Sequence, residues 1–347
     1  MNRRSFLTAL GAAPFVGGCR SFVDDVLSNC PTPSNVDWIV DVAHPVFFGV
    51  EEAAGAPRAM RVFFPSVRDG TLLEPCLQSW PIVLFLHGMP PRGVSNSTWA
   101  SAWTHLPATI ARCGYIVGVP SHDAQQIESD PAATVAAAIA DIEWLRSGWT
   151  GSRWIDKRPT STVVAGHSYG ALIAARTAAA HEVGALVSLS GPYIQDGVSR
   201  QALRRVTAPC FFMWGDDENG QTNQQDDLDQ AMFWSNELEQ NRYAAVYHGE
   251  HFDYVDAVHT GGAPRGPCAH VDAASADLAA LFVAANIASL TAVGVDLRKP
   301  QATLSPQQQV FAQDHLVGLD QFTGPRCRMT LRWIVDGQTG ARQFGLP

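Results

Sequence analysis

Short apolar runs alternate with longer stretches of helical pattern along most of the chain. Apolar runs of about five residues are typical of strands, and a fully apolar run between proline and glycine, as at 82–86, is typical of a central parallel strand buried on both faces. The runs with this pattern are 46–50, 60–64, 82–86, 115–119, 161–165, 183–189, 210–214 and 242–247. Because helical stretches separate most of them, the sequence predicts an α/β fold with a mostly parallel central sheet and helices on both faces.

Two helical stretches stand out in this pattern. The stretch 131–146 is predicted to be a helix because Asp130 can cap it, Pro131 suits its first turn and alanines fill it. The apolar stretch 277–287 predicts a second helix late in the chain.

The alternation of strands and helices does not continue to the end of the chain. Residues 38–290 are predicted to form one α/β domain, and 291–347 an extension packed on the same domain, with a small hairpin formed by 328–335 and 341–345. The connection between the strands 183–189 and 210–214 is short, so no large cap domain is expected.

Composition and charge narrow the function classes. The chain is 46% hydrophobic and 16% charged, which is enough apolar material for a large core. Its formal net charge is −9 and no dense run of Lys or Arg offsets it, which argues against a nucleic-acid-binding protein. No uninterrupted apolar run reaches the length of about 18 residues that a membrane-spanning helix needs.

The N-terminal residues have the pattern of an export signal. A basic start is followed by a short apolar segment that ends at Cys19, so residues 1–18 are predicted to be a signal peptide and 19–37 a polar tether. The string Arg3-Arg4-Ser5-Phe6-Leu7 resembles a twin-arginine signal of bacterial proteins.

Cys19 is the candidate for a lipid anchor. The string Val16-Gly17-Gly18-Cys19 resembles a bacterial lipobox, which implies cleavage before Cys19 and acylation of its new N-terminus. The expected location is the cell envelope or periplasm, on a membrane through this anchor; a soluble periplasmic protein cleaved nearby is the alternative. A Cys19→Ala variant that stays in the membrane fraction would exclude the anchor.

The other cysteines give no metal or disulfide pattern. The chain has seven cysteines, and no CxxC spacing suggests zinc or fixes a pairing. Cys210 lies in an apolar strand-like run, so a disulfide and a buried free thiol both stay open for it.

The strongest chemical signal is the string Gly166-His167-Ser168-Tyr169-Gly170. It matches G-x-S-x-G and follows the predicted strand 161–165 directly, with an alanine-rich helical stretch after it. In that context the motif resembles the nucleophile turn of the α/β-hydrolase family, which implies that Ser168 is a catalytic nucleophile. The alternative is a packing turn with an uninvolved serine.

The resemblance implies that a histidine late in the chain is the base for Ser168. His251 is the first candidate because it follows the last predicted parallel strand, 242–247. His248 is the rival, but it is so close to the strand end that its side chain would more naturally pack there.

The acid that orients this histidine is expected after the strand 210–214. Related hydrolases commonly have Gly-x-x-Asp here, which would place the acid at Glu218. Asp is the more usual residue type, which favours Asp217. Both stay open, and Asp216 is a third candidate.

Two backbone amides are expected to form an oxyanion hole. The family takes one from the residue after the nucleophile, here Tyr169, and one from the loop after an earlier strand, here Met89 in the His87-Gly88 loop.

The order of oxyanion loop, nucleophile, acid and base is that of the α/β-hydrolases, and the resemblance covers roughly residues 46–287. Within the family, 61–65, the His87-Gly88 loop and 251–254 look most like the dienelactone hydrolase, cutinase and platelet-activating-factor acetylhydrolase branch. This implies hydrolysis of a small-molecule or lipid-like carboxylic ester. Amidase, thioesterase or perhydrolase chemistry and a non-catalytic surface lipoprotein are the alternatives. No cofactor and no metal are expected, because no HExxH or similar ligand spacing is present.

Overall fold

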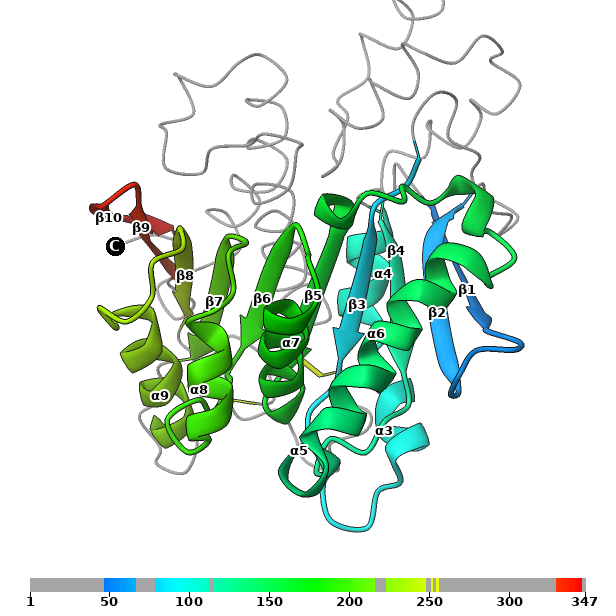
Figure 1. The fold of residues 1–347 in the computed structure, drawn as a ribbon, viewed down its shortest axis with the longest axis horizontal. Helices are drawn as coiled ribbons and strands as arrows, with labels where there is room; N and C mark the ends of the chain where they lie inside the picture. The colour runs from blue at the N-terminus through cyan, green and yellow to red at the C-terminus, as the bar shows by residue number, and fades with distance from the viewer. Residues whose placement is uncertain are drawn as a thin grey trace, which may run out of the picture.

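A computed structural model of the chain describes residues 47–66, 79–112, 115–215, 223–247, 251, 254–255 and 329–344. These residues form a ten-stranded mixed sheet with helices on both faces (Figure 1), so the predicted α/β class is confirmed. The predicted helix 277–287 and the N-terminal segments with Cys19 lie outside the described residues.

The strands β1 to β8 correspond to the eight runs predicted from the sequence. Their bounds are β1 Phe47–Glu52, β2 Met60–Ser66, β3 Ile82–Leu86, β4 Ile116–Pro120, β5 Thr162–His167, β6 Ala185–Leu189, β7 Cys210–Gly215 and β8 Arg242–Tyr247. Every residue of β3, β4, β5, β6 and β7 is buried, as expected for strands covered on both faces.

The order of the strands places a switch point at the centre of the sheet. The order is β1-β2-β4-β3-β5-β6-β7-β8-β9-β10, and the six strands from β4 to β8 are parallel to one another. After β3 the chain moves to one side to form β4, and it then returns to the other side of β3 to form β5. In open α/β sheets, sites form at the carboxyl ends of the strands on either side of such a reversal. Here these strands are β3 and β5.

Helices cover the sheet on both faces (Figure 1). Their bounds are α3 Asn96–Ser101, α4 His105–Arg112, α5 Gln126–Ser129, α6 Pro131–Ser147, α7 Tyr169–Ala180, α8 Gly197–Leu203 and α9 Asn223–Phe233. In the view of Figure 1, α6, α7, α8 and α9 lie in front of the sheet and α4 lies behind it. The predicted start of α6 is confirmed, since the Asp130 carboxylate accepts a hydrogen bond from the Ala133 N–H at 3.1 Å and Pro131 opens the helix.

Two apolar clusters, one on each face, hold these layers together. Phe85 and Trp103 belong to the cluster on the α4 side, and Leu172 and Phe212 to the cluster on the α7 side. Cys210 is a buried free thiol in the second cluster, which decides between the two interpretations of this residue. None of the helices among the described residues is long and apolar enough to span a bilayer.

The hairpin predicted near the C-terminus extends the sheet. Its strands are β9 Met329–Val335 and β10 Gln338–Phe344, which pair with each other, and β9 also pairs antiparallel with β8. The last described segment of the chain therefore completes one edge of the sheet.

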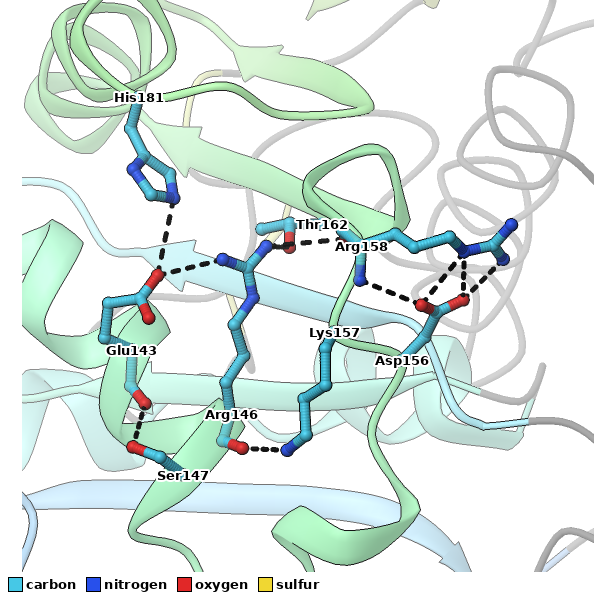
Figure 2. A network of polar contacts seen from close by, with 8 residues as sticks. All are labelled: Glu143, Arg146, Ser147, Asp156, Lys157, Arg158, Thr162 and His181. Carbon is cyan, nitrogen blue, oxygen red and sulfur yellow. Dashed lines mark hydrogen bonds and ion pairs between the residues drawn. The ribbon is translucent and has the colours of Figure 1, made fainter.

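A network of charged side chains lies near the amino end of β5 (Figure 2). The Arg146 guanidinium on α6 donates to Thr162 Oγ1 at 2.6 Å and pairs with Glu143 at 2.9 Å. Arg158 pairs with Asp156 at 2.5 Å, and the Lys157 ammonium donates to the backbone carbonyl of Arg146. These contacts tie the end of α6 to the start of β5.

Candidate active site

Ser168 lies at a tight turn between β5 and α7. Its backbone has φ 53° and ψ −125°, a conformation that non-glycine residues rarely adopt, at a cost of about 1–3 kcal/mol. Its N–H donates to the Leu189 carbonyl at 2.8 Å, and its carbonyl accepts from the Ala171 N–H at 2.9 Å. The surrounding hydrogen bonds thus hold a strained turn at the end of β5, where the sequence motif predicts one.

The glycines of the motif are required by close backbone contacts. A Cβ at Gly166 would lie 2.2 Å from the Gly170 carbonyl oxygen, and a Cβ at Gly170 would lie 2.0 Å from the Leu86 carbonyl oxygen. Because each contact is to backbone, neither clash could be relieved by a side-chain movement. The absence of side chains therefore lets α7 start directly against the end of β3.

The loop after β3 lies directly against Ser168. A Cβ at Gly88 would be 2.8 Å from the Ser168 Cβ and 3.0 Å from the His167 carbonyl oxygen. Met89 follows Gly88, and its side chain is 40% exposed. Tyr169 is the first residue of α7, so its N–H is one of the four that have no carbonyl partner within the helix. Both predicted oxyanion donors therefore belong to segments that border Ser168.

The Tyr169 side chain ties this start of α7 to α5. Its hydroxyl donates to the Glu128 carboxylate at 2.7 Å, and this hydrogen bond, followed by burial, raises the pKa of Tyr169 to about 12. Farther along α7, Arg176 donates to Ser199 Oγ at 2.6 Å and pairs with Asp196. These contacts fix α7 between α5 and α8.

His251 packs against His167, the neighbour of Ser168 in the sequence. The His251 carbonyl accepts a hydrogen bond from His167 Nε2 at 2.7 Å, and the two imidazole rings lie 4.6 Å apart, centroid to centroid. His167 is the residue directly before Ser168. Burial lowers the pKa of His251 to about 4, so its ring is a neutral base at pH 7.

Tyr254 anchors the same segment to the ends of the neighbouring strands. Its hydroxyl donates to the Met213 carbonyl of β7 at 3.2 Å and lies 3.4 Å from Ser190 Oγ, just after β6. Its ring lies 5.4 Å from that of His167. His251 and Tyr254, far from Ser168 in sequence, are therefore placed at the carboxyl edge of the sheet.

Two buried histidines at this edge are not predicted from the sequence as part of the site. His122 follows β4 and stacks on His87, with ring centroids 3.9 Å apart and an interplanar angle of 24°. The ring of His167 packs against Trp103 at 5.1 Å as well as against His251. Burial holds the pKa of both His122 and His167 well below the usual value. The signal that could have found them is their position, since each lies at or just after the end of a parallel strand.

Several predicted residues lie outside the described part of the chain. They are Asp216, Asp217, Glu218 and His248. Because β7 ends at Gly215, the chain leaves the sheet at the carboxyl edge immediately before the three acidic candidates. Three aromatic side chains, those of Trp99, Tyr193 and Trp214, are fully buried in the two apolar clusters and belong to the core.

The described residues bring together a serine hydroxyl at a strained turn, buried imidazoles and the two segments that carry the Met89 and Tyr169 N–H groups. Within the described residues no group of three or more His, Cys, Asp or Glu is placed to hold a metal ion. Neither protein-family models nor curated proteins give a match to this sequence. The functional assignment therefore depends on the site geometry.

Proposed function

We propose that this protein is a serine-dependent carboxylic ester hydrolase with the α/β-hydrolase fold. The observation that carries the proposal is the strained Ser168 turn, with the backbone of His251 hydrogen-bonded to the preceding residue and the Gly88 loop packed against the serine. A serine on such a strand-to-helix turn, a late histidine and a loop after an earlier strand are the parts that this fold uses for acyl transfer.

In the proposed mechanism, His251 acts first as a general base. It takes the proton of the Ser168 hydroxyl as the oxygen attacks the ester carbonyl carbon. The negative charge that develops on the carbonyl oxygen is stabilised by the N–H groups of Met89 and Tyr169. The protonated His251 then gives its proton to the leaving alcohol, and an acyl-enzyme remains on Ser168.

Water completes the cycle through the same groups. His251 takes a proton from the attacking water, the two backbone N–H groups again stabilise the tetrahedral oxygen, and Ser168 leaves with its proton restored. An acid at Asp217 or Glu218 would stabilise the charged imidazole in both steps. The protein needs no cofactor for this chemistry.

The direct test replaces the nucleophile. Ser168→Ala is expected to reduce kcat on a short-chain nitrophenyl ester by about 10⁶-fold, to background, because no acyl-enzyme can form. The matched control is Ser161→Ala, which removes the hydroxyl of a buried serine directly before the amino end of β5 and should leave kcat within about 2-fold.

A fluorophosphonate probe separates a catalyst from a binding protein that retains the fold. The wild type should be labelled at Ser168, and Ser168→Ala should not. Ester hydrolysis by a folded Ser168→Ala variant would refute the proposal, and competing ester and amide substrates would identify a different acyl specificity.

A further inference from the structure

His122 makes three contacts with His87, which is part of the loop against Ser168. Its backbone N–H points to His87 Nε2 at 3.4 Å, its ring Nε2 lies 3.0 Å from the His87 carbonyl oxygen, and the two rings stack. Both side chains are at least 96% buried. Contacts on three sides leave the His87 ring little freedom to rotate.

These contacts determine which nitrogen of His87 carries the proton. A nitrogen that accepts a hydrogen bond from a backbone N–H must be unprotonated, so the contact with His122 assigns the proton of neutral His87 to Nδ1. This Nδ1 lies 2.8 Å from the Gly88 carbonyl oxygen and can donate to it. The two assignments are consistent with one tautomer.

The hydrogen bond from His87 fixes the orientation of the Gly88–Met89 peptide. In a trans peptide the C=O and N–H point in opposite directions, so a Gly88 carbonyl held toward the His87 ring turns the Met89 N–H away from it. This peptide borders Ser168, because Gly88 packs against the Ser168 Cβ. Rotation of the peptide would replace a donor by a carbonyl oxygen at the position where the oxyanion needs hydrogen bonds.

We propose that His122 is a positioning residue, which holds His87 in the Nδ1–H tautomer and so keeps the Met89 N–H directed for oxyanion binding. This inference rests on the proposed ester hydrolysis for its catalytic part. The tautomer of His87 is independent of any activity, so the two parts can fail separately.

The structural part is tested by ¹⁵N NMR of imidazole-labelled protein, with the His87 signals assigned through a His87→Asn variant. In the wild type at pH 7, His87 should show a protonated Nδ1 and an unprotonated Nε2. The Nε2–H tautomer, or a charged ring, would overturn the inference whatever the activity of the protein.

The catalytic part is tested by His122→Phe and His122→Gln. His122→Phe keeps the backbone N–H and an aromatic ring against His87 but loses the ring nitrogen that lies 3.0 Å from the His87 carbonyl oxygen. We expect kcat to fall about 10- to 100-fold with KM within about 3-fold, as for a misplaced catalytic group. His122→Gln can still donate from its side chain to the His87 carbonyl, and it should recover most of this loss. The matched control is His181→Asn, at the other end of the sheet, with unchanged kcat.

Active-site titration separates positioning from a loss of folded protein. Rates are expressed per site that reacts with the fluorophosphonate, so a merely structural role would leave kcat unchanged. A folded His122→Phe variant with the wild-type kcat, or with its whole loss in KM, would overturn the catalytic part. If the wild type hydrolyses no ester while His87 shows the expected tautomer, the proposed function fails and the structural role of His122 stands.

Discussion

The amino and carboxyl edges of the parallel strands hold polar side chains in opposite ways. At the amino edge, charged groups are paired with one another, and several reach solvent, as the 72% exposed Arg158 side chain does. At the carboxyl edge, buried imidazoles and the Ser168 hydroxyl are packed among backbone carbonyls and aromatic rings. Only the second arrangement keeps bases uncharged at neutral pH.

This difference separates stabilising interactions from chemical ones. A paired charge at the amino edge lowers the free energy of the folded state, but its cationic partner lowers the pKa of the carboxylate and makes it a poor proton acceptor. A buried neutral imidazole lowers stability when it must be protonated, but it can accept a proton from a neighbouring hydroxyl. We therefore expect substitutions at the carboxyl edge to change rates and pH dependence, and substitutions at the amino edge to change stability alone.

Among the substitutions that compare the two edges, the largest effect is expected for the acid that we propose after β7. Replacing the true triad acid, by Asp217→Asn or by Glu218→Gln, should lower kcat about 10⁴-fold, because His251 loses the carboxylate that stabilises its charged form. The other variant should change kcat little. Steady-state kinetics on the same ester decides between the two residues, and if neither variant loses activity the acid has been placed wrongly.

The same two variants give a second readout in the pH profile. His251 must be unprotonated to act, so kcat/KM rises with pH through the pKa of His251 in the free enzyme. Burial lowers this pKa to about 4, and a neighbouring carboxylate raises it. The acid limb should therefore move to lower pH in the variant that removes the acid. A limb that stays at the wild-type pH would show that this carboxylate does not face His251.

The next largest effect is on stability between pH 6.5 and 4. Burial lowers the pKa of His87 from 6.5 to about 4. Above pH 6.5 the contribution of neutral His87 to the free energy of unfolding is fully present. As the pH falls toward 4, the unfolded chain binds a proton that folded His87 does not, so the free energy of unfolding decreases. The loss for His87 is about 3 kcal/mol, and His122 acts in the same direction.

Neighbouring charges at the carboxyl edge modify this loss. Arg58 lowers the pKa of both His87 and His122, and Asp123 raises that of His87. Asp141 pairs with Arg58, but burial raises its pKa to about 6. The contribution of Asp141 to stability has the opposite pH dependence, because it is present at low pH and is lost as the pH rises through 6. Its size is about that of one buried histidine, so it offsets the loss from one of the two.

The amino edge contributes in a different pH window. Burial raises the pKa of Asp156, but hydrogen bonds from Arg158 and Ser161 outweigh it and lower this pKa to about 2. The stability from Asp156 is therefore present above pH 3.8 and lost only below it. Urea unfolding at pH 7, 6 and 5 should show a smaller pH slope for His87→Asn than for the wild type. Equal slopes in the two proteins would show that His87 titrates alike when folded and unfolded.

The sequence predicts features formed by neighbouring residues better than it predicts contacts between segments far apart in the chain. The apolar runs predict β1 to β8, and Asp130 with Pro131 predicts the start of α6, because these signals are contained in neighbouring residues. The hairpin β9–β10 is predicted as well. Its pairing with β8 is not, because the sequence signal of a strand does not specify its neighbour in the sheet.

The site follows the same rule. Ser168 is predicted because a strand, a G-x-S-x-G turn and a helix stand next to each other in the sequence. The role of His122 depends on β3 and β4 lying side by side, and no local pattern encodes that contact. The sequence favours His251 over His248 by its distance from the strand end, and the structure adds the hydrogen bond between His251 and His167.

The smallest effect that still separates the two edges is expected at Arg146. Arg146→Met keeps much of the apolar stem but leaves the buried Thr162 hydroxyl without its charged donor, and it should lower the free energy of unfolding by about 2 kcal/mol. The control is Arg158→Met, whose exposed guanidinium should contribute little. Both variants should keep kcat/KM within about 2-fold, because β5 separates them from Ser168. If Arg146→Met instead lowered kcat at unchanged stability, the charged edge would take part in positioning Ser168, and the division between a stabilising and a chemical edge would be wrong.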